Sequence, residues 1–365
     1  MATTNPTKRS SGSPNGTAKS PREATSPGQA QADADAVAFQ AENTIEVGTD
    51  SGDSDTGYHT DTGSAASTSI SSSVRDFTFE NGRRYHRFRE GTYAMPNDEA
   101  EQDREDMKHA MSVNLCGGRL HLAPLDNPQN IIDLGTGTGI WAIDMGDDYP
   151  SASILGIDLS PIQPAWVPPN VRFMVDDAES PWLHPANHFD FVHARFCAQA
   201  FKDFPRLLSR AYEHLKPGGW VEFQDMVHLA HCDDGSLDEE RYCHMLKWLA
   251  LLDEGLQRFG VHLNGCCQHE QRMINAGFIN VEQRIFKVPI GQWPKNRTLK
   301  LIGLYLRTVL IEGLQGISLG AFTRGLGWTR EEVELMLVDV RKALLDSSQH
   351  TYFTFYAVYG QKPMT

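Results

Sequence analysis

Residues 131–139 read Ile131-Ile132-Asp133-Leu134-Gly135-Thr136-Gly137-Thr138-Gly139, in a chain of 365 residues. The apolar start of this stretch predicts a buried strand, and the apolar residues at 140–143 predict a helix directly after the glycines. A glycine-rich turn between a strand and a helix is typical of a site where a ligand approaches the backbone closely, because a Cβ atom would block that approach. The stretch therefore predicts an α/β domain with a ligand-binding turn.

The sequence on both sides of this turn continues the α/β pattern. Short apolar runs predict five parallel strands, at 130–134, 153–158, 171–175, 189–194 and 220–223. The helical spacing of apolar residues at 203–215 predicts a helix before the last of these strands. Two later runs rich in aromatic and β-branched residues, 278–288 and 352–359, predict an antiparallel pair that completes the sheet. We expect a doubly wound, mostly parallel sheet.

Segments outside this core are expected to form additional layers. Residues 76–125 are expected to form an N-terminal helical cap, with Asn97 capping a helix that packs over the sheet. Within the domain at 126–365, an apolar run and a capping box at Thr329 and Glu332 predict a helical insertion at about 294–345. Residues 1–75 consist mostly of Ser, Thr, Ala, Gly and Pro, so we expect a disordered tail, because such a segment buries too little apolar surface.

Composition excludes several classes of function. The chain has 33 basic and 47 acidic residues, a net charge of -14, which argues against nucleic-acid binding through phosphate contacts. It has neither an 18-residue apolar run nor a signal peptide, which argues against a membrane and predicts an intracellular location, cytoplasm or nucleus. Its six cysteines form no C-x-x-C pair, and the His and Cys residues of 228–269 lack the spacing of zinc ligands, so no metal is expected.

Two acidic residues narrow the ligand of the glycine turn. Asp158 ends the second predicted strand, where a carboxylate can accept both hydrogen bonds of a ribose diol, so an adenosine-containing cofactor is expected. The spacing Gly137-x-Gly139-x-x-Ala142 also fits a permissive dinucleotide fingerprint. Asp133 favours a cofactor with a methionine moiety over a dinucleotide, because an acid at this position can face the amino group of the methionine but fits poorly against a pyrophosphate.

These motifs, in this order, resemble the class I S-adenosylmethionine-dependent methyltransferases over about residues 130–225. The resemblance implies that Asp133 and the glycines bind the methionine end of S-adenosylmethionine, Asp158 the ribose, and Asp177 with Ala178 the adenine. The full set of expected cofactor-binding residues is Asp133, Gly135, Thr136, Gly137, Gly139, Asp158, Leu159, Asp177 and Ala178.

A narrower resemblance extends over most of residues 79–363. Residues 81–91, Asn-Gly-Arg-Arg-Tyr-His-Arg-Phe-Arg-Glu-Gly, and 160–164, Ser-Pro-Ile-Gln-Pro, are similar to the fungal LaeA-like methyltransferases. That family implies a link to secondary metabolism, through regulation or metabolite tailoring, and velvet proteins as partners. A second interpretation is a regulatory module that binds the cofactor with little or no turnover. A nicotinamide-dependent oxidoreductase is disfavoured by the spacing around Asp133.

Methyl transfer requires little acid or base chemistry, because the sulfonium is already activated and positioning accounts for much of the rate. His193, at the end of the fourth predicted strand, is the candidate base, and the alternative is a hydrogen-bonded histidine with no proton to move. Residues 193–196 lack the Asn/Asp-Pro-Pro-Tyr/Phe motif of methyltransferases that act on adenine or glutamine. The acceptor stays open, and the apolar run 299–314 fits either a lid over an apolar substrate or burial in the core.

Overall fold

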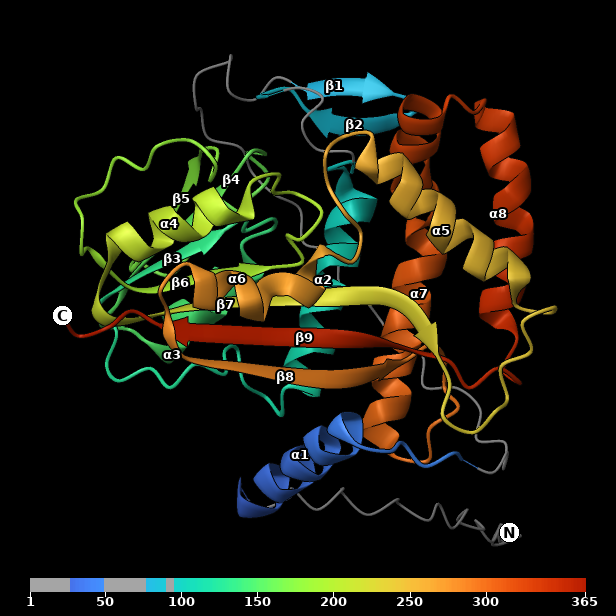
Figure 1. Ribbon diagram of the computed structural model, residues 1–365, viewed down its shortest axis with the longest axis horizontal. Coiled ribbons are helices and arrows are strands. Elements are labelled where there is room, and N and C mark those ends of the chain that lie inside the picture. The colour runs from blue at the N-terminus through green and yellow to red at the C-terminus, as the bar shows by residue number, and fades with distance from the viewer. Residues whose placement is uncertain (1–26, 49–76, 90–94) are drawn as a thin grey trace, which may run out of the picture.

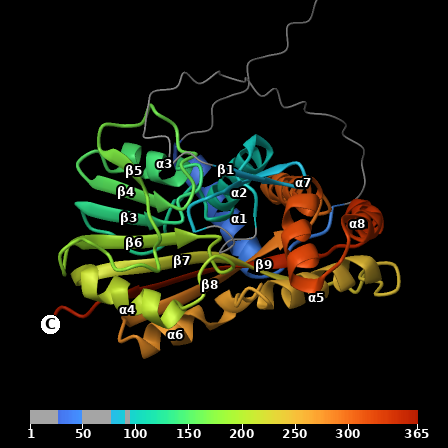
Figure 2. The ribbon, with the colours of Figure 1, turned by 90° about the horizontal axis from the view of Figure 1, so that it is seen from above.

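The computed structural model describes residues 27–48, 77–89 and 95–365. Within these residues, seven strands form one mixed sheet in the order β5-β4-β3-β6-β7-β9-β8 (Figures 1 and 2). The parallel strands are β3 (Asn130–Leu134), β4 (Ser153–Asp158), β5 (Val171–Val175), β6 (Phe189–Arg195) and β7 (Leu215–His231). Strand β9 (Tyr352–Gln361) runs antiparallel between β7 and β8 (Ile279–Pro289). The predicted fold class is confirmed, and β7 is longer than the strand expected at 220–223.

Helices cover both faces of the sheet, because successive residues of a strand point to opposite sides. Ile132 and Val192 pack with α4 (Phe204–His214) and α6 (His269–Asn275), which follows the 3₁₀ turn at Gly265–Gln268. Ile131 and Phe191 face the other side, where α3 (Ile140–Asp148) and α2 (Glu99–Leu115) lie. Figure 2 shows α4 and α6 on the face opposite α2 and α3. The sheet is therefore doubly wound.

The predicted helical insertion consists of α7 (Arg297–Leu319), a π-helical turn at Gly320–Gly325, and α8 (Arg330–Leu345). The capping box of Thr329 and Glu332 is present at the start of α8. Helix α7 packs against α2, and α5 (Cys243–Gln257) packs against α8 and the π-helical turn. These helices form a layer beyond the carboxyl end of β7 (Figure 1).

The N-terminal cap differs from its prediction in two respects. A hairpin of β1 (Phe77–Glu80) and β2 (Arg83–His86) precedes α2, and Arg83 pairs with Asp98 at 2.5 Å. The N-cap of α2 is Asp98, whose carboxylate accepts from the backbone N–H of Glu101, and not Asn97. The Asn97 side chain is buried and donates instead to Ser160 Oγ at 3.2 Å.

Part of the predicted disordered tail is ordered. Residues Pro27–Glu42 form helix α1, which packs against β8 and α7 below the sheet (Figure 1). Val37, Ala38 and Ala41 are buried, and Glu42 accepts a hydrogen bond from Arg284 at 2.6 Å. These buried side chains recur at helical spacing and gain burial that the average composition of the segment conceals, whereas Phe39 on the same helix is 67% exposed. The remainder of the predicted tail, 1–26 and 49–75, lies outside the described residues.

In the ranges that the structure describes, no helix combines the length and the apolar character needed to cross a membrane. In the same ranges, no three His, Cys, Asp or Glu side chains are grouped in a way that could hold a metal ion.

Candidate functional site

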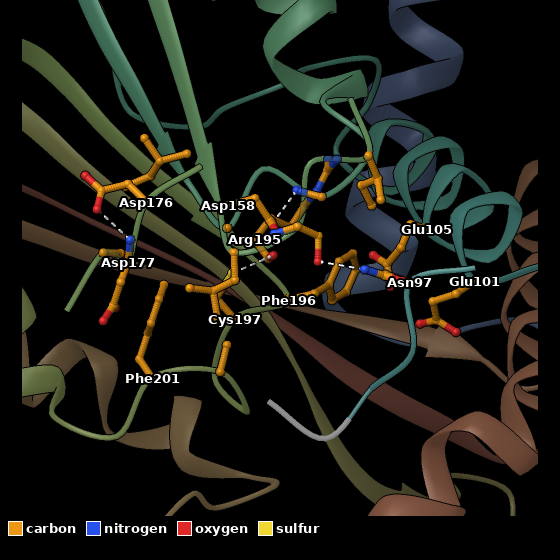
Figure 3. Close-up of a pocket in the computed structure, with 18 of the residues that line it drawn as sticks. Asn97, Glu101, Glu105, Asp158, Asp176, Asp177, Arg195, Phe196, Cys197 and Phe201 are labelled. Atoms are coloured by element: carbon orange, nitrogen blue, oxygen red, sulfur yellow. Dashed lines mark hydrogen bonds between the residues drawn. The ribbon is translucent and has the colours of Figure 1, made fainter. Parts of the chain in front are cut away.

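Two adjoining cavities lie at the carboxyl edge of β3, β4 and β6, and Figure 3 shows side chains that line the larger one. The larger cavity encloses about 1120 Å³, its open mouth included, and the smaller about 380 Å³. We call them together the donor cavity. The predicted cofactor-binding residues that line the larger cavity are Gly135, Gly137, Asp158, Leu159, Asp177 and Ala178. Those that line the smaller cavity are Asp133, Gly135, Thr136 and Gly137.

The glycine turn has the backbone that its composition predicts. Gly135, Gly137 and Gly139 have φ angles of 68°, 58° and 85°, in the left-handed region that favours glycine. A Cβ atom added to Gly137 would have no described atom within 4 Å, so that position faces the donor cavity. A Cβ atom on Gly139 would lie 2.3 Å from the Phe173 ring, so Gly139, which lines neither part of the cavity, serves helix packing.

Asp158 ends β4 with its carboxylate held by two backbone groups. Its Oδ2 accepts from Gly137 N at 2.9 Å, and its Oδ1 accepts from Ser160 N at 2.8 Å. Burial raises the pKa of Asp158 to about 6. Each oxygen keeps a lone pair, so the fixed carboxylate can still accept hydrogen bonds from a diol.

Asp133 and His193 lie opposite each other on the paired strands β3 and β6. His193 is fully buried, and its Nδ1 lies 2.7 Å from Asp133 Oδ1. Its ring stacks on Trp141 with centroids 3.7 Å apart and planes 6° apart. Because burial lowers the pKa of His193, the ring is neutral, and the Nδ1 that faces the carboxylate is its N–H donor. The other nitrogen, Nε2, is buried without a hydrogen-bond partner among the described residues.

Comparisons with known proteins agree with this geometry. A family model described as a methyltransferase domain matches residues 107–275. The methyltransferase pytC of Aspergillus terreus is 41% identical over 331 residues, which are 90% of this chain and 98% of pytC. The chain belongs to the methyltransferase family of pytC and the LaeA regulators.

Two further relatives have names that state a regulatory role or a substrate. The secondary metabolism regulator LAE1 of Cochliobolus heterostrophus is 36% identical, over 78% of this methyltransferase and 94% of LAE1. The protein-methionine methyltransferase laeA of Emericella nidulans is 31% identical, over 81% and 79% of the two chains. Among solved structures, phosphoethanolamine N-methyltransferase 2 of Haemonchus contortus with S-adenosylmethionine aligns with a TM-score of 0.40 and 20% identity, over 75% and 54%.

The donor cavity fits S-adenosylmethionine, the methyl donor expected from the sequence. Gly137 lines both parts of the cavity, with Asp133 in the smaller part and Asp158 in the larger, which suits a ligand with an amino group at one end and a ribose at the other. Of the two residues predicted to hold the adenine, Ala178 is buried, and Asp177 is fixed by hydrogen bonds from Glu179 N at 2.9 Å and Ser180 Oγ at 3.1 Å.

Arg195 lines both parts of the donor cavity and was not among the predicted cofactor-binding residues. Its Nη2 donates to His109 Nδ1 at 2.7 Å, and His109 Nε2 lies 2.9 Å from Asp144 Oδ2. Arg195 is therefore held by side chains of α2 and α3. The position of Arg195 at the carboxyl end of β6 could have marked it as a residue of the site. Its contact with His109, 86 residues earlier in the chain, leaves no local mark in the sequence.

Proposed function

We propose that this methyltransferase transfers a methyl group from S-adenosylmethionine to an acceptor bound beyond the carboxyl edge of the sheet, in fungal secondary metabolism. The single observation that carries the proposal is the glycine turn, where Gly137 faces open space in a cavity that is also lined by two fixed carboxylates, Asp133 and Asp158.

When bound, S-adenosylmethionine supplies an activated methyl group on a positively charged sulfur. In this proposal Asp133 accepts hydrogen bonds from the amino group, Asp158 accepts them from the ribose hydroxyls, and Arg195 pairs with the methionine carboxylate. His193 donates to Asp133 and fixes that carboxylate. The chain thus contributes orientation, which alone can supply much of the rate of an in-line displacement.

The biological setting is proposed from the relatives. The likeness to pytC over nearly the whole chain supports an active enzyme, which tailors a metabolite or modifies a regulator inside the cell, in the cytoplasm or the nucleus. The likeness to LAE1 and laeA supports the second candidate, a regulatory module that binds the donor and acts through partners such as velvet proteins.

Calorimetric titration tests the donor, and a variant separates the two candidates. We expect S-adenosylmethionine to bind with micromolar affinity at one site, and NADH and NADPH not to bind. Absence of S-adenosylmethionine binding would refute the proposal. In a fungal deletion strain, Gly137→Ala fails to restore the metabolite profile if methyl transfer is required. If the protein is instead a module that binds the donor but does not need it to act through its partners, Gly137→Ala retains both its velvet proteins and its effect.

A further inference from the structure

A third cavity lies between the sheet and the helices of the cap and insertion. It encloses about 650 Å³, including the part open to solvent, and we call it the cap cavity. Its walls come from α2, β7, α5 and α7, and they are mainly apolar, including Met111, Met226, Trp248, Leu252, Leu306 and Val309. This volume is a little over half that of the larger part of the donor cavity, so the space suits a small ligand.

Phe196 connects the cap cavity to the donor cavity. The residue lines the cap cavity and both parts of the donor cavity, so the three spaces meet at this side chain. Its φ angle is 55°, a left-handed backbone that is rare for a bulky residue and occurs where function constrains the chain. The strained backbone is held by a hydrogen bond from Phe196 N to Gln224 O at 2.8 Å. A ligand in the cap cavity therefore lies next to the donor.

The cations at the wall of the cap cavity are already neutralised. Arg104 is paired with Glu101 and with Glu105, and Lys108 Nζ lies 2.6 Å from Glu105. Lys108 also lies over the Phe196 ring, 4.4 Å from its centroid. A charged ligand would lose its hydration on entering this cavity and would find no unpaired opposite charge there, so its binding would be costly. These walls therefore favour a neutral ligand.

One polar atom in this wall has no partner. The Nδ1 atom of His228 is buried and has no hydrogen-bond partner among the described residues. The backbone of His228 is fixed by Asn264 Oδ1 at 2.7 Å, and its ring packs against Phe353 with centroids 5.3 Å apart. Burial lowers the pKa of His228 to about 4, so the imidazole is neutral near pH 7. A buried polar atom without a partner, in a wall that is mainly apolar, is suited to orient a ligand through one hydroxyl group.

We propose that the cap cavity binds the methyl acceptor, and that the acceptor is a small, neutral, largely apolar molecule with a hydroxyl group that hydrogen-bonds to His228 Nδ1. This assignment rests on the proposed methyl transfer. A lone pair of the acceptor atom forms the new bond to the methyl carbon while the carbon–sulfur bond breaks. The electron pair of that bond stays on sulfur, which becomes a neutral thioether, and the acceptor's proton leaves to solvent.

Binding of 1-naphthol, with naphthalene as the matched probe without a hydroxyl, tests the site. The full chain is titrated with each probe by fluorescence, alone and at saturating S-adenosylhomocysteine. We expect naphthol to bind at one site, more tightly than naphthalene, and S-adenosylhomocysteine not to displace it. His228→Leu should weaken naphthol binding about tenfold and leave naphthalene binding unchanged, because it removes one hydrogen bond.

Substitutions on α7 locate the bound probe. Val309→Phe fills the cap cavity and should weaken binding of both probes at least tenfold, whereas Leu301→Phe, on the exposed side of the same helix, should not. An unchanged affinity for S-adenosylhomocysteine shows that each variant is folded, and Leu310→Phe replaces Val309→Phe if that chain does not fold.

Equal naphthol binding by the filled and control variants, or its displacement by S-adenosylhomocysteine, would overturn the assignment. Absence of naphthol binding, with methyl transfer to a protein side chain instead, would also overturn it. Failure of the proposed function would give a different result. S-adenosylhomocysteine would then not bind, while binding of the two probes would still show whether the cap cavity takes an apolar ligand.

Discussion

Gly137→Ala separates the role of the glycine turn in folding from its role in donor binding. The added Cβ atom has no described atom within 4 Å, so the folded chain accommodates it without a clash. The cost in stability is that of a left-handed alanine at a φ of 58°, about 1–2 kcal/mol. For a domain of this size that cost lowers the Tm by roughly 2–8 °C. The affinity for S-adenosylmethionine should fall at least tenfold, about 1.4 kcal/mol or more, because the Cβ atom occupies the donor cavity.

Two other glycines provide the controls. Gly235 has a φ of 74° and also has no described atom within 4 Å of an added Cβ, so Gly235→Ala carries the same strain away from the donor cavity. It should lose a similar amount of stability and bind S-adenosylmethionine normally. Gly139→Ala places a Cβ atom 2.3 Å from the Phe173 ring, so it should lose more stability than either.

The assay combines thermal unfolding of the three variants with calorimetric titration of S-adenosylmethionine at one temperature below all their Tm values. The reasoning is refuted if Gly137→Ala binds with wild-type affinity. It is also refuted if Gly235→Ala loses as much affinity as Gly137→Ala, because strain alone would then explain the loss.

Three further predictions follow from single contacts. Because burial raises the pKa of Asp158 to about 6, its charged form destabilises the ligand-free protein above that pH. The free energy of unfolding, measured with denaturant, should therefore rise by roughly 1–3 kcal/mol as the pH falls from 7 toward 4, and this rise should be absent in Asp158→Asn. His193→Leu removes the 2.7 Å donor of Asp133 and should raise the KM for S-adenosylmethionine tenfold or more with an unchanged pH profile of kcat, whereas loss of a base would lower kcat alone. Val37→Ser, buried on α1, should cost about 1–2 kcal/mol in thermal unfolding, and Phe39→Ser, two residues away and 67% exposed, should cost almost nothing; equal effects would mean that α1 does not dock.

The sequence by itself determined the strands of the large sheet, the glycine turn and part of the lining of the donor cavity, but it predicted neither the β1–β2 hairpin nor the place of Arg195 in that cavity. Buried parallel strands are continuous apolar runs, and left-handed turns that approach a ligand require glycine, so both leave a local mark. The runs at 130–134, 153–158 and 171–175 coincide with β3, β4 and β5 for this reason. The same local logic located the capping box of Thr329 and Glu332.

Only the tertiary structure decided the contacts between segments that are distant along the chain. His193 lies 60 residues from Asp133, and nothing local marks it as the buried hydrogen-bond partner of that carboxylate. Helix α1 is ordered because β8 and α7 supply an apolar surface that a Ser- and Thr-rich composition does not reveal. The cap cavity likewise exists only where α2, α5 and α7 meet β7. A side chain is buried only where another segment covers it, and that depends on which faces of distant elements pack together.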